Sequence, residues 1–211
     1  MKFSEKMQWL NKKSDAYQEL NEIGEKLPSN KEIASSILEE LGNSTTQCVE
    51  DKDIKSSYYV YLKDTIYLSS HKNCGQDYTR ICLVAHECIH SIQAKWLQML
   101  NFILSNIELI AFVILAILMC FSIAKTVCFG LYVVIVILSC IPRVVLESDA
   151  IRRSIPTSKQ YLNSRISEYE TGKLVAAYAF QNKILMPLFY GNLFVGKLIR
   201  IAILMAILFF R

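Results

Sequence analysis

The chain has 211 residues, a formal net charge of +4 and a hydrophobic fraction of 53%. The positive charge comes with no surface of interleaved basic and aromatic residues, which argues against a nucleic-acid-binding protein. Seven cysteines, an odd number without any C-x-x-C pair, argue against a disulfide scaffold and fit a reducing, cytosolic environment.

The first part of the chain is polar, and its opening residues predict two helices. Apolar residues at helical spacing predict an amphipathic helix over residues 1–28, which a proline ends. We expect this helix to pack on the core of the domain rather than on a membrane surface. Ser29 and Glu32 then form a capping-box pattern, so a second helix is expected to run to Leu41 and to stop at Gly42.

A β-hairpin and a further helix are predicted next. Residues 58–62 and 65–68 are rich in aromatic and β-branched side chains and flank a two-residue turn. Residues 78–96 contain neither proline nor glycine, Asp77 precedes them as a candidate cap, and apolar residues recur at three- and four-residue steps. This segment is therefore expected to be an amphipathic helix.

The predicted helix carries the sequence His86-Glu87-Cys88-Ile89-His90, which matches the H-E-x-x-H pattern of zincin peptidases. On a helix, His86 and His90 lie one turn apart on one face, where two imidazoles can bind one zinc ion. Zinc lowers the pKa of a bound water to about 7, so Glu87 can serve as the catalytic base. Cys88 points to the opposite face and is expected to pack in the core.

The strand before the active helix commonly borders the substrate cleft in zincins. Residues 65–69 are the candidate for that strand here, and they could pair with an extended peptide by β-augmentation. Ordinary sheet structure is the other role for this strand, and the two roles are compatible.

The second part of the chain predicts membrane segments. Leu109 to Ala124 and Thr126 to Pro142 are free of charge and are separated by a single lysine. Each is close to the lower end of the about 17–25 residues of a membrane span, so together they predict a transmembrane hairpin. The apolar stretch from Leu193 to Phe210 is also expected to span, with Lys197 and Arg200 reaching the interface.

The distribution of positive charge predicts the topology. Lysines are dense in residues 1–95, three arginines follow the second apolar run, and the tip of the hairpin has one lysine. By the positive-inside rule, the polar domain and both flanks of the hairpin face the cytoplasm. Residues 1–13 lack the apolar segment of a secretory signal.

A catalytic zinc site needs a third protein ligand. The remaining histidine, His71, lies in a polar loop and is expected to be solvated. A membrane hairpin returns the chain to the side from which it left, so Glu147 and Asp149, just after the second apolar run, are expected close to the active helix. Geometry alone leaves both carboxylates as candidates.

Two spaced motifs make the chain resemble the bacterial neutral zinc metallopeptidase family, a group of membrane-associated zincins. One is H-E-x-x-H-x-x-Q, present here at residues 86–93, and the other is E-x-D-A-x-R-R, present at residues 147–153. The likeness covers roughly residues 29–180. It implies that His86, His90 and Glu147 bind Zn²⁺, that Glu87 is the base, and that Asp149 orients a ligand histidine by accepting its N–H.

The sequence therefore predicts an α+β, mostly helical membrane protein with a small zincin-like domain and a transmembrane helical hairpin. The expected segments are an N-terminal helix (1–28), the zincin-like domain (29–97), the hairpin (98–142), the third-ligand segment (143–173) and an apolar C-terminal region (174–211). The expected function is that of a membrane-anchored zinc endopeptidase, multi-pass in the cell membrane, which acts on peptides or membrane-protein segments at the cytoplasmic face.

Two alternatives differ in what they require. A non-catalytic scaffold would keep zinc, or only the fold, in order to bind a partner. An intramembrane site-2-type protease would place the motif inside an apolar span with an Asp-Gly third-ligand segment. The motif here is flanked by Arg80, Gln93 and Lys95, and the chain contains no Asp-Gly pair, which disfavours the intramembrane alternative.

Overall fold

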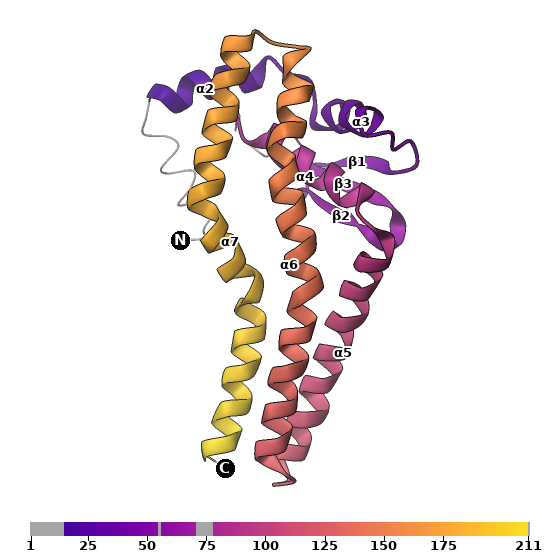
Figure 1. The fold of residues 1–211 in the computed structure, drawn as a ribbon, viewed down its shortest axis with the longest axis vertical. Coiled ribbons are helices and arrows are strands. Elements are labelled where there is room, and N and C mark those ends of the chain that lie inside the picture. The colour runs from indigo at the N-terminus through magenta and orange to yellow at the C-terminus, as the bar shows by residue number, and fades with distance from the viewer. Residues whose placement is uncertain (1–14, 55, 71–77, 211) are drawn as a thin grey trace. The chain divides into compact units, whose positions relative to one another are not determined.

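The computed structural model describes residues 15–54, 56–70 and 78–210, and it is mostly helical with one small sheet (Figure 1). This content agrees with the predicted α+β class. The chain divides into two compact units. Unit 1 comprises the residues up to Ile92 together with Ala150–Gln181, and unit 2 comprises Gln93–Asp149 together with Asn182–Arg211.

Unit 1 begins, within the described residues, with two helices. Helix α2 spans Asp15–Glu25, and helix α3 spans Asn30–Glu40. The predicted capping box is present, because Ser29 Oγ accepts the Glu32 amide and the Glu32 carboxylate accepts the Ser29 amide, both at 3.3 Å. Leu20 and Leu27 are buried in the core of unit 1, which confirms the predicted packing of the N-terminal helix for the part described.

The sheet of unit 1 has three strands in the order β1-β3-β2. Strand β1 (Gln47–Asp51) runs parallel to β3 (Thr65–Ser69), and β2 (Tyr58–Val60) runs antiparallel to it. The predicted hairpin is confirmed, but its connection is a single 3₁₀ turn, η1 (Tyr61–Lys63), followed by Asp64 in the left-handed region at φ 45°. Tyr59 Oη and Thr46 Oγ1 both donate to Asp64 Oδ1, which holds this turn.

The prediction that residues 65–69 offer a free edge to a substrate is wrong. All five residues of β3 pair with β1 on one side, and Thr65–Tyr67 pair with β2 on the other. The Ser69 amide donates to Ser57 Oγ at 3.0 Å, which closes the rest of that second edge. Strand β1 was not predicted because Gln-Cys-Val-Glu-Asp carries little β-branched or aromatic signal; its partner strand supplies the reason for its conformation.

The active helix is shorter than predicted. Helix α4 spans Arg80–Ile92, and a new helix, α5 (Lys95–Cys120), begins after a break at Gln93 and Ala94. The sequence has no glycine or proline at this position, so the helical pattern of apolar residues continues and gives no sign of the break. The Gln93 side chain makes tertiary hydrogen bonds at this point, and Trp96, expected on the buried face, is 69% exposed on α5.

Arg80 joins the first turn of α4 to the end of α2 and the start of α3. Its side chain is buried and donates to the carbonyl oxygens of Gly24, Leu27 and Pro28, each at 2.8 Å, and to Asn30 Oδ1 at 2.9 Å. Helix ends leave backbone carbonyls without intrahelical partners. The guanidinium satisfies several of these groups at once.

The sheet and the remaining helices complete unit 1. Helix α3 packs on β1 and β3, α4 packs on β2 and β3, and the two helices contact each other. The end of helix α6 (Lys125–Asn163) and the start of helix α7 (Glu168–Phe210) also belong to this unit. The Tyr178 hydroxyl donates to the Tyr78 carbonyl at 2.7 Å, which ties α7 to the residues before α4.

Unit 2 contains α5, the first part of α6 and the last part of α7. A turn with Ser122 (φ 61°) and Ala124 (φ 40°) in the left-handed region connects α5 to α6. Among the described residues, α5 and α6 are the helices long and apolar enough to cross a membrane. Only 17% and 28% of their most apolar windows are buried within the molecule.

Candidate metal centre

Helix α4 places the two motif histidines together. His86 and His90 are one turn apart, their Nε2 atoms are 3.1 Å apart, and their rings meet edge to face at 87°. Two nitrogens bound to one tetrahedral zinc ion, with bonds of about 2.0–2.1 Å, lie about 3.3 Å apart. Both side chains are half-buried. The pair therefore has the separation that a shared metal ion requires.

Glu147 completes a group that can hold a metal ion. One ligand atom from each of His86, His90 and Glu147 lies within 4.8 Å of the others. Glu147 is buried, at 3% exposed, in the interior of α6. Among the described residues, this is the group of three or more potential metal ligands whose ligand atoms all lie this close to one another.

Helix geometry explains why Glu147 lies close to the histidines. Within unit 1, Cys82 of α4 contacts Ser154 of α6 at 3.5 Å. Ser154 is seven residues after Glu147, which is two turns along the same face of α6. His86 is one turn after Cys82 on α4. Both motif histidines and Glu147 are thus close in sequence to a contact between α4 and α6 within unit 1.

Gln93 fixes the residues on both sides of Glu147. Its Nε2 donates to the Leu146 carbonyl at 2.7 Å and to Asp149 Oδ2 at 3.0 Å. Gln93 follows His90 by three residues, just after the end of α4. The chain after the motif is thus bonded to the backbone and side chain that flank the third candidate ligand.

Arg143 provides a counter-charge for Glu147. Its Nη2 lies 2.7 Å from Glu147 Oε1, one turn away on α6. The arginine side chain is 43% exposed while the carboxylate is 4% exposed. A buried carboxylate is stable only with such a partner or with a metal ion.

The other predicted residues fall as follows. Glu87 is half-buried on α4, next to His86. Cys88 is fully buried and its Sγ lies 3.8 Å from the Ala34 carbonyl, so it packs on the core side of α4 as predicted. Burial raises the pKa of the Cys88 thiol well above its ordinary value. His71 lies outside the described residues.

The hydrogen bond from a ligand histidine to Asp149 stays a prediction, whereas Asp149 does accept from Gln93. Sequence reasoning placed Gln93 in the H-E-x-x-H-x-x-Q motif and counted Arg143 in the topology, but it gave neither a contact near Glu147. It gave no role to Tyr190, whose hydroxyl lies 2.6 Å from Ser148 Oγ, next to Glu147. Helical spacing contained a signal for Arg143, four residues before Glu147, but Gln93 and Tyr190 depend on tertiary contacts.

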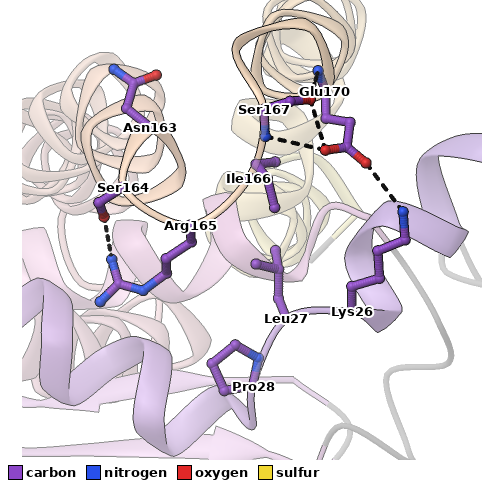
Figure 2. Close-up of a pocket in the computed structure, with 9 residues that line it drawn as sticks. All are labelled: Lys26, Leu27, Pro28, Asn163, Ser164, Arg165, Ile166, Ser167 and Glu170. Atoms are coloured by element: carbon purple, nitrogen blue, oxygen red, sulfur yellow. Dashed lines mark hydrogen bonds and ion pairs between the residues drawn. The ribbon is translucent and has the colours of Figure 1, made fainter.

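A separate pocket lies in unit 1 and contains none of the predicted site residues. It has a volume of about 690 Å³ and is lined by residues 26–28, residues 163–167 and Glu170 (Figure 2). Its polar groups are engaged in local structure. Ser167 and Glu170 cap the start of α7 reciprocally, and Glu170 also pairs with Lys26 at 3.1 Å.

Comparisons of the chain with protein-family models, with curated proteins and with solved structures give no match. The functional argument therefore rests on the residues and their geometry.

Proposed function

We propose that the protein is a membrane-anchored zinc-dependent endopeptidase. The observation that carries this proposal is the grouping of His86, His90 and Glu147 on two helices, with Glu87 in the same helical turn as the first histidine. Two imidazoles and one carboxylate are the ligand set of one class of catalytic zinc sites. Three protein ligands leave one coordination position open for water or substrate.

The donor types and their spacing fit zinc. Imidazole nitrogen and carboxylate oxygen both suit a borderline-soft divalent ion, and the histidine nitrogens already have the required separation. Glu147 would hold the ion with one carboxylate oxygen while Arg143 neutralises the other. Gln93 would keep the segment of α6 around Glu147 in place.

When bound, zinc supplies Lewis acidity, which polarises the scissile carbonyl and lowers the pKa of water. Glu87 would accept a proton from the attacking water and pass it to the leaving amine nitrogen. Its position beside His86 suits this task, because a carboxylate next to a ligand can reach the water without binding the ion.

The substrates proposed are peptides or membrane-protein segments at the cytoplasmic surface. The support is the pair of apolar helices, α5 and α6, together with the concentration of positive charge in the polar part of the chain. Since α6 carries both an apolar run and Glu147, the candidate site belongs to the same helix as a candidate span.

The test is the metal content of the full chain purified in detergent. We expect near-stoichiometric zinc in the wild type, loss in Glu147→Ala and retention in Asp149→Ala. Glu168→Ala, at the exposed start of α7, is the control for removal of a carboxylate. Glu87→Gln should keep the metal and lose peptide cleavage. Folded wild-type protein that takes up no zinc even after reconstitution would overturn the proposal.

A second candidate is a zinc-binding scaffold without catalysis. The ion pair between Arg143 and Glu147 favours the form of this scaffold that keeps only the fold, because the buried carboxylate is neutralised without a metal. A scaffold would keep its cellular role in Glu87→Gln, whereas a peptidase would lose its role together with turnover.

A further inference from the structure

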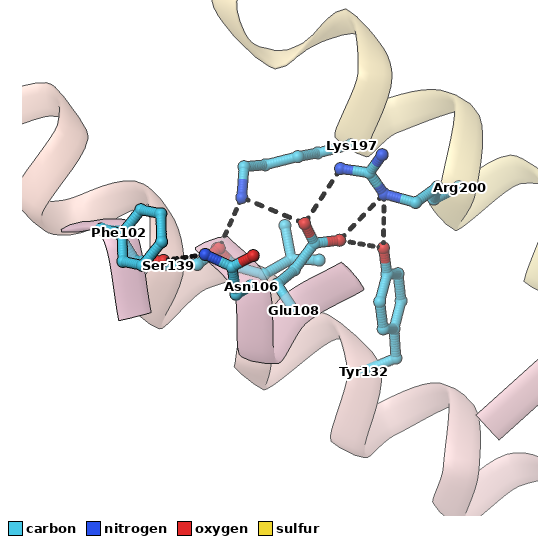
Figure 3. A network of polar contacts seen from close by, with 8 residues as sticks. Phe102, Asn106, Glu108, Tyr132, Ser139, Lys197 and Arg200 are labelled. Carbon is cyan, nitrogen blue, oxygen red and sulfur yellow. Dashed lines mark hydrogen bonds and ion pairs between the residues drawn. The ribbon is translucent and has the colours of Figure 1, made fainter. Parts of the chain in front are cut away.

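Unit 2 contains a cluster of charged and polar side chains between its apolar helices (Figure 3). Glu108 of α5 is at its centre, 1% exposed. From α7, Arg200 donates to the two Glu108 oxygens at 3.0 and 2.9 Å, and Lys197 lies 3.4 Å from Glu108 Oε2. From α6, the Tyr132 hydroxyl donates to Glu108 and Ser139 Oγ accepts from Lys197 at 2.6 Å.

The charges of this cluster do not cancel. One carboxylate faces two cations, so the group carries one excess positive charge. Among the residues that the structure describes, Arg200 Nη1 has no hydrogen-bond partner, and in Figure 3 it is the guanidinium nitrogen without a dashed line. The Arg200 side chain is 25% exposed while that of Glu108 is 2% exposed, so Arg200 is the more accessible of the two charged partners.

Among the side chains that the structure describes, none fills the space next to Gly196 except Arg200. Gly196 precedes Arg200 by one turn on α7, and a Cβ atom added there would lie 3.9 Å from Nη1. Gly196 is itself exposed. Any larger side chain at this position would project next to the free guanidinium nitrogen.

The cluster lies toward the end of the apolar runs that is far from the hairpin turn, below the headgroups of that leaflet if α5 and α6 cross a membrane. Glu108 immediately precedes the charge-free run that ends at Ala124, and at 1.5 Å per residue it is about 24 Å from the turn. Ser139 lies close to the corresponding end of the charge-free run of α6, just before Arg143. A hydrocarbon layer is about 30 Å thick, so Glu108 would lie about 6 Å inside the boundary opposite the hairpin turn, a depth from which lysine and arginine side chains commonly reach lipid headgroups.

We propose that Arg200, Lys197 and the open space at Gly196 form a binding site for a phosphate monoanion, as carried by an anionic phospholipid. An excess positive charge near hydrocarbon is costly unless an anion accompanies it. Guanidinium and ammonium groups facing the membrane bind lipid phosphates by charge-assisted hydrogen bonds. The site is independent of the candidate metal centre.

The experiment measures lipid retained by the full chain. The protein is purified in detergent with equal amounts of phosphatidylglycerol and phosphatidylcholine, and bound lipid is counted by native mass spectrometry. Arg200→Gln removes the donor, and Gly196→Leu fills the space without changing any charge. Glu108→Gln raises the excess charge from one to two. Lys183→Gln is the control, since Lys183 is an exposed lysine on the same helix.

We expect the wild type and Lys183→Gln to retain phosphatidylglycerol in preference to phosphatidylcholine. Arg200→Gln and Gly196→Leu should lower that retention at least about tenfold, the effect of one hydrogen bond to a charged group. Glu108→Gln should retain more. If Arg200→Gln does not fold, Gly196→Leu decides the question, because it leaves the ion pairs intact.

Adding millimolar inorganic phosphate distinguishes the source of the anion. Displacement of phosphatidylglycerol would assign a free phosphate, and unchanged retention would assign a lipid headgroup. Equal retention of the two lipids by the wild type would overturn the proposal. Retention by Gly196→Leu at the level of Lys183→Gln would overturn it as well, and would leave the cluster as an ion pair that only holds α5, α6 and α7 together.

Discussion

Replacing Arg80 by methionine should destabilise unit 1 more than any exposed substitution. Methionine has a similar length and no donor, so the change removes four hydrogen bonds of 2.8–2.9 Å from a side chain that is 2% exposed. The carbonyls of Gly24, Leu27 and Pro28 would lose this donor in a region that water does not reach easily. The end of α2 and the start of α3 would then lack their common anchor.

The magnitude follows from the acceptors. A buried acceptor left without a partner costs about 1–3 kcal/mol. Three acceptors are affected, the Leu27 and Pro28 carbonyls and Asn30 Oδ1, whereas the Gly24 carbonyl also accepts from the Leu27 amide. The loss is offset in part because methionine carries no charge to desolvate. We therefore expect a decrease of about 3–5 kcal/mol in the free energy of unfolding. The stability of Arg80→Lys should lie between those of the wild type and Arg80→Met, because one ammonium group reaches fewer of the four acceptors.

Hydrogen exchange of the α3 amides in the full chain, measured in detergent, is the assay. A loss of 3 kcal/mol or more corresponds to exchange faster by about a hundredfold or more, at about 1.4 kcal/mol per factor of ten. Arg152→Met is the matched control, since Arg152 is exposed on α6 and should change exchange little. Exchange in Arg80→Met within about threefold of the control would refute the argument.

Three further predictions test other parts of the structure. Gln93→Leu should lower zinc affinity by about 10–100-fold while the ligands stay in place, measured by competition with a chelator; unchanged affinity would remove Gln93 from the site. Ser29→Ala should lower stability by about 1 kcal/mol through loss of the capping box, and a thermal shift equal to that of an exposed serine substitution would contradict this. Burial raises the pKa of the Cys82 and Cys88 thiols above the ordinary value of 9.0. Above that pH the unfolded chain loses these protons while the folded chain keeps them, so the contribution of the two thiols to the stability of the fold is present at neutral pH and decreases as the pH rises. A double alanine variant at these cysteines should lose less stability between pH 8 and pH 10 than the wild type; equal losses would contradict the assignment.

Local patterns were sufficient for the elements that are capped or strongly periodic. The Ser29 capping box, the end of α3 before Gly42, and the two apolar helices follow from side chains close together in sequence. The break at Gln93 and the strand β1 depend on partners far away in sequence, so no local signal marks them. Strand β3 lies in the centre of the sheet because β1 pairs with it, so its central position could not be predicted without β1.

The candidate metal centre was predictable to the level of its ligand group. The spacing of His86 and His90 requires a helix, and the return of a hairpin favours the Glu147 region. In the structure one ligand atom from each of His86, His90 and Glu147 lies within 4.8 Å of the others, and Glu147 rather than Asp149 as the third ligand stays a prediction. The Gln93 contacts could not be predicted, because they join two segments separated by the whole hairpin.

Helix α6 has a consequence for how such a protein can change in evolution. It runs from Lys125 to Asn163 as one helix, so its apolar face and Glu147 share a single rotational phase. Inserting one residue before Glu147 would turn the apolar side chains that precede it by about 100° relative to the carboxylate. The length of this apolar segment should therefore vary in steps near whole helical turns, while changes of a single residue are expected at the loop that precedes it.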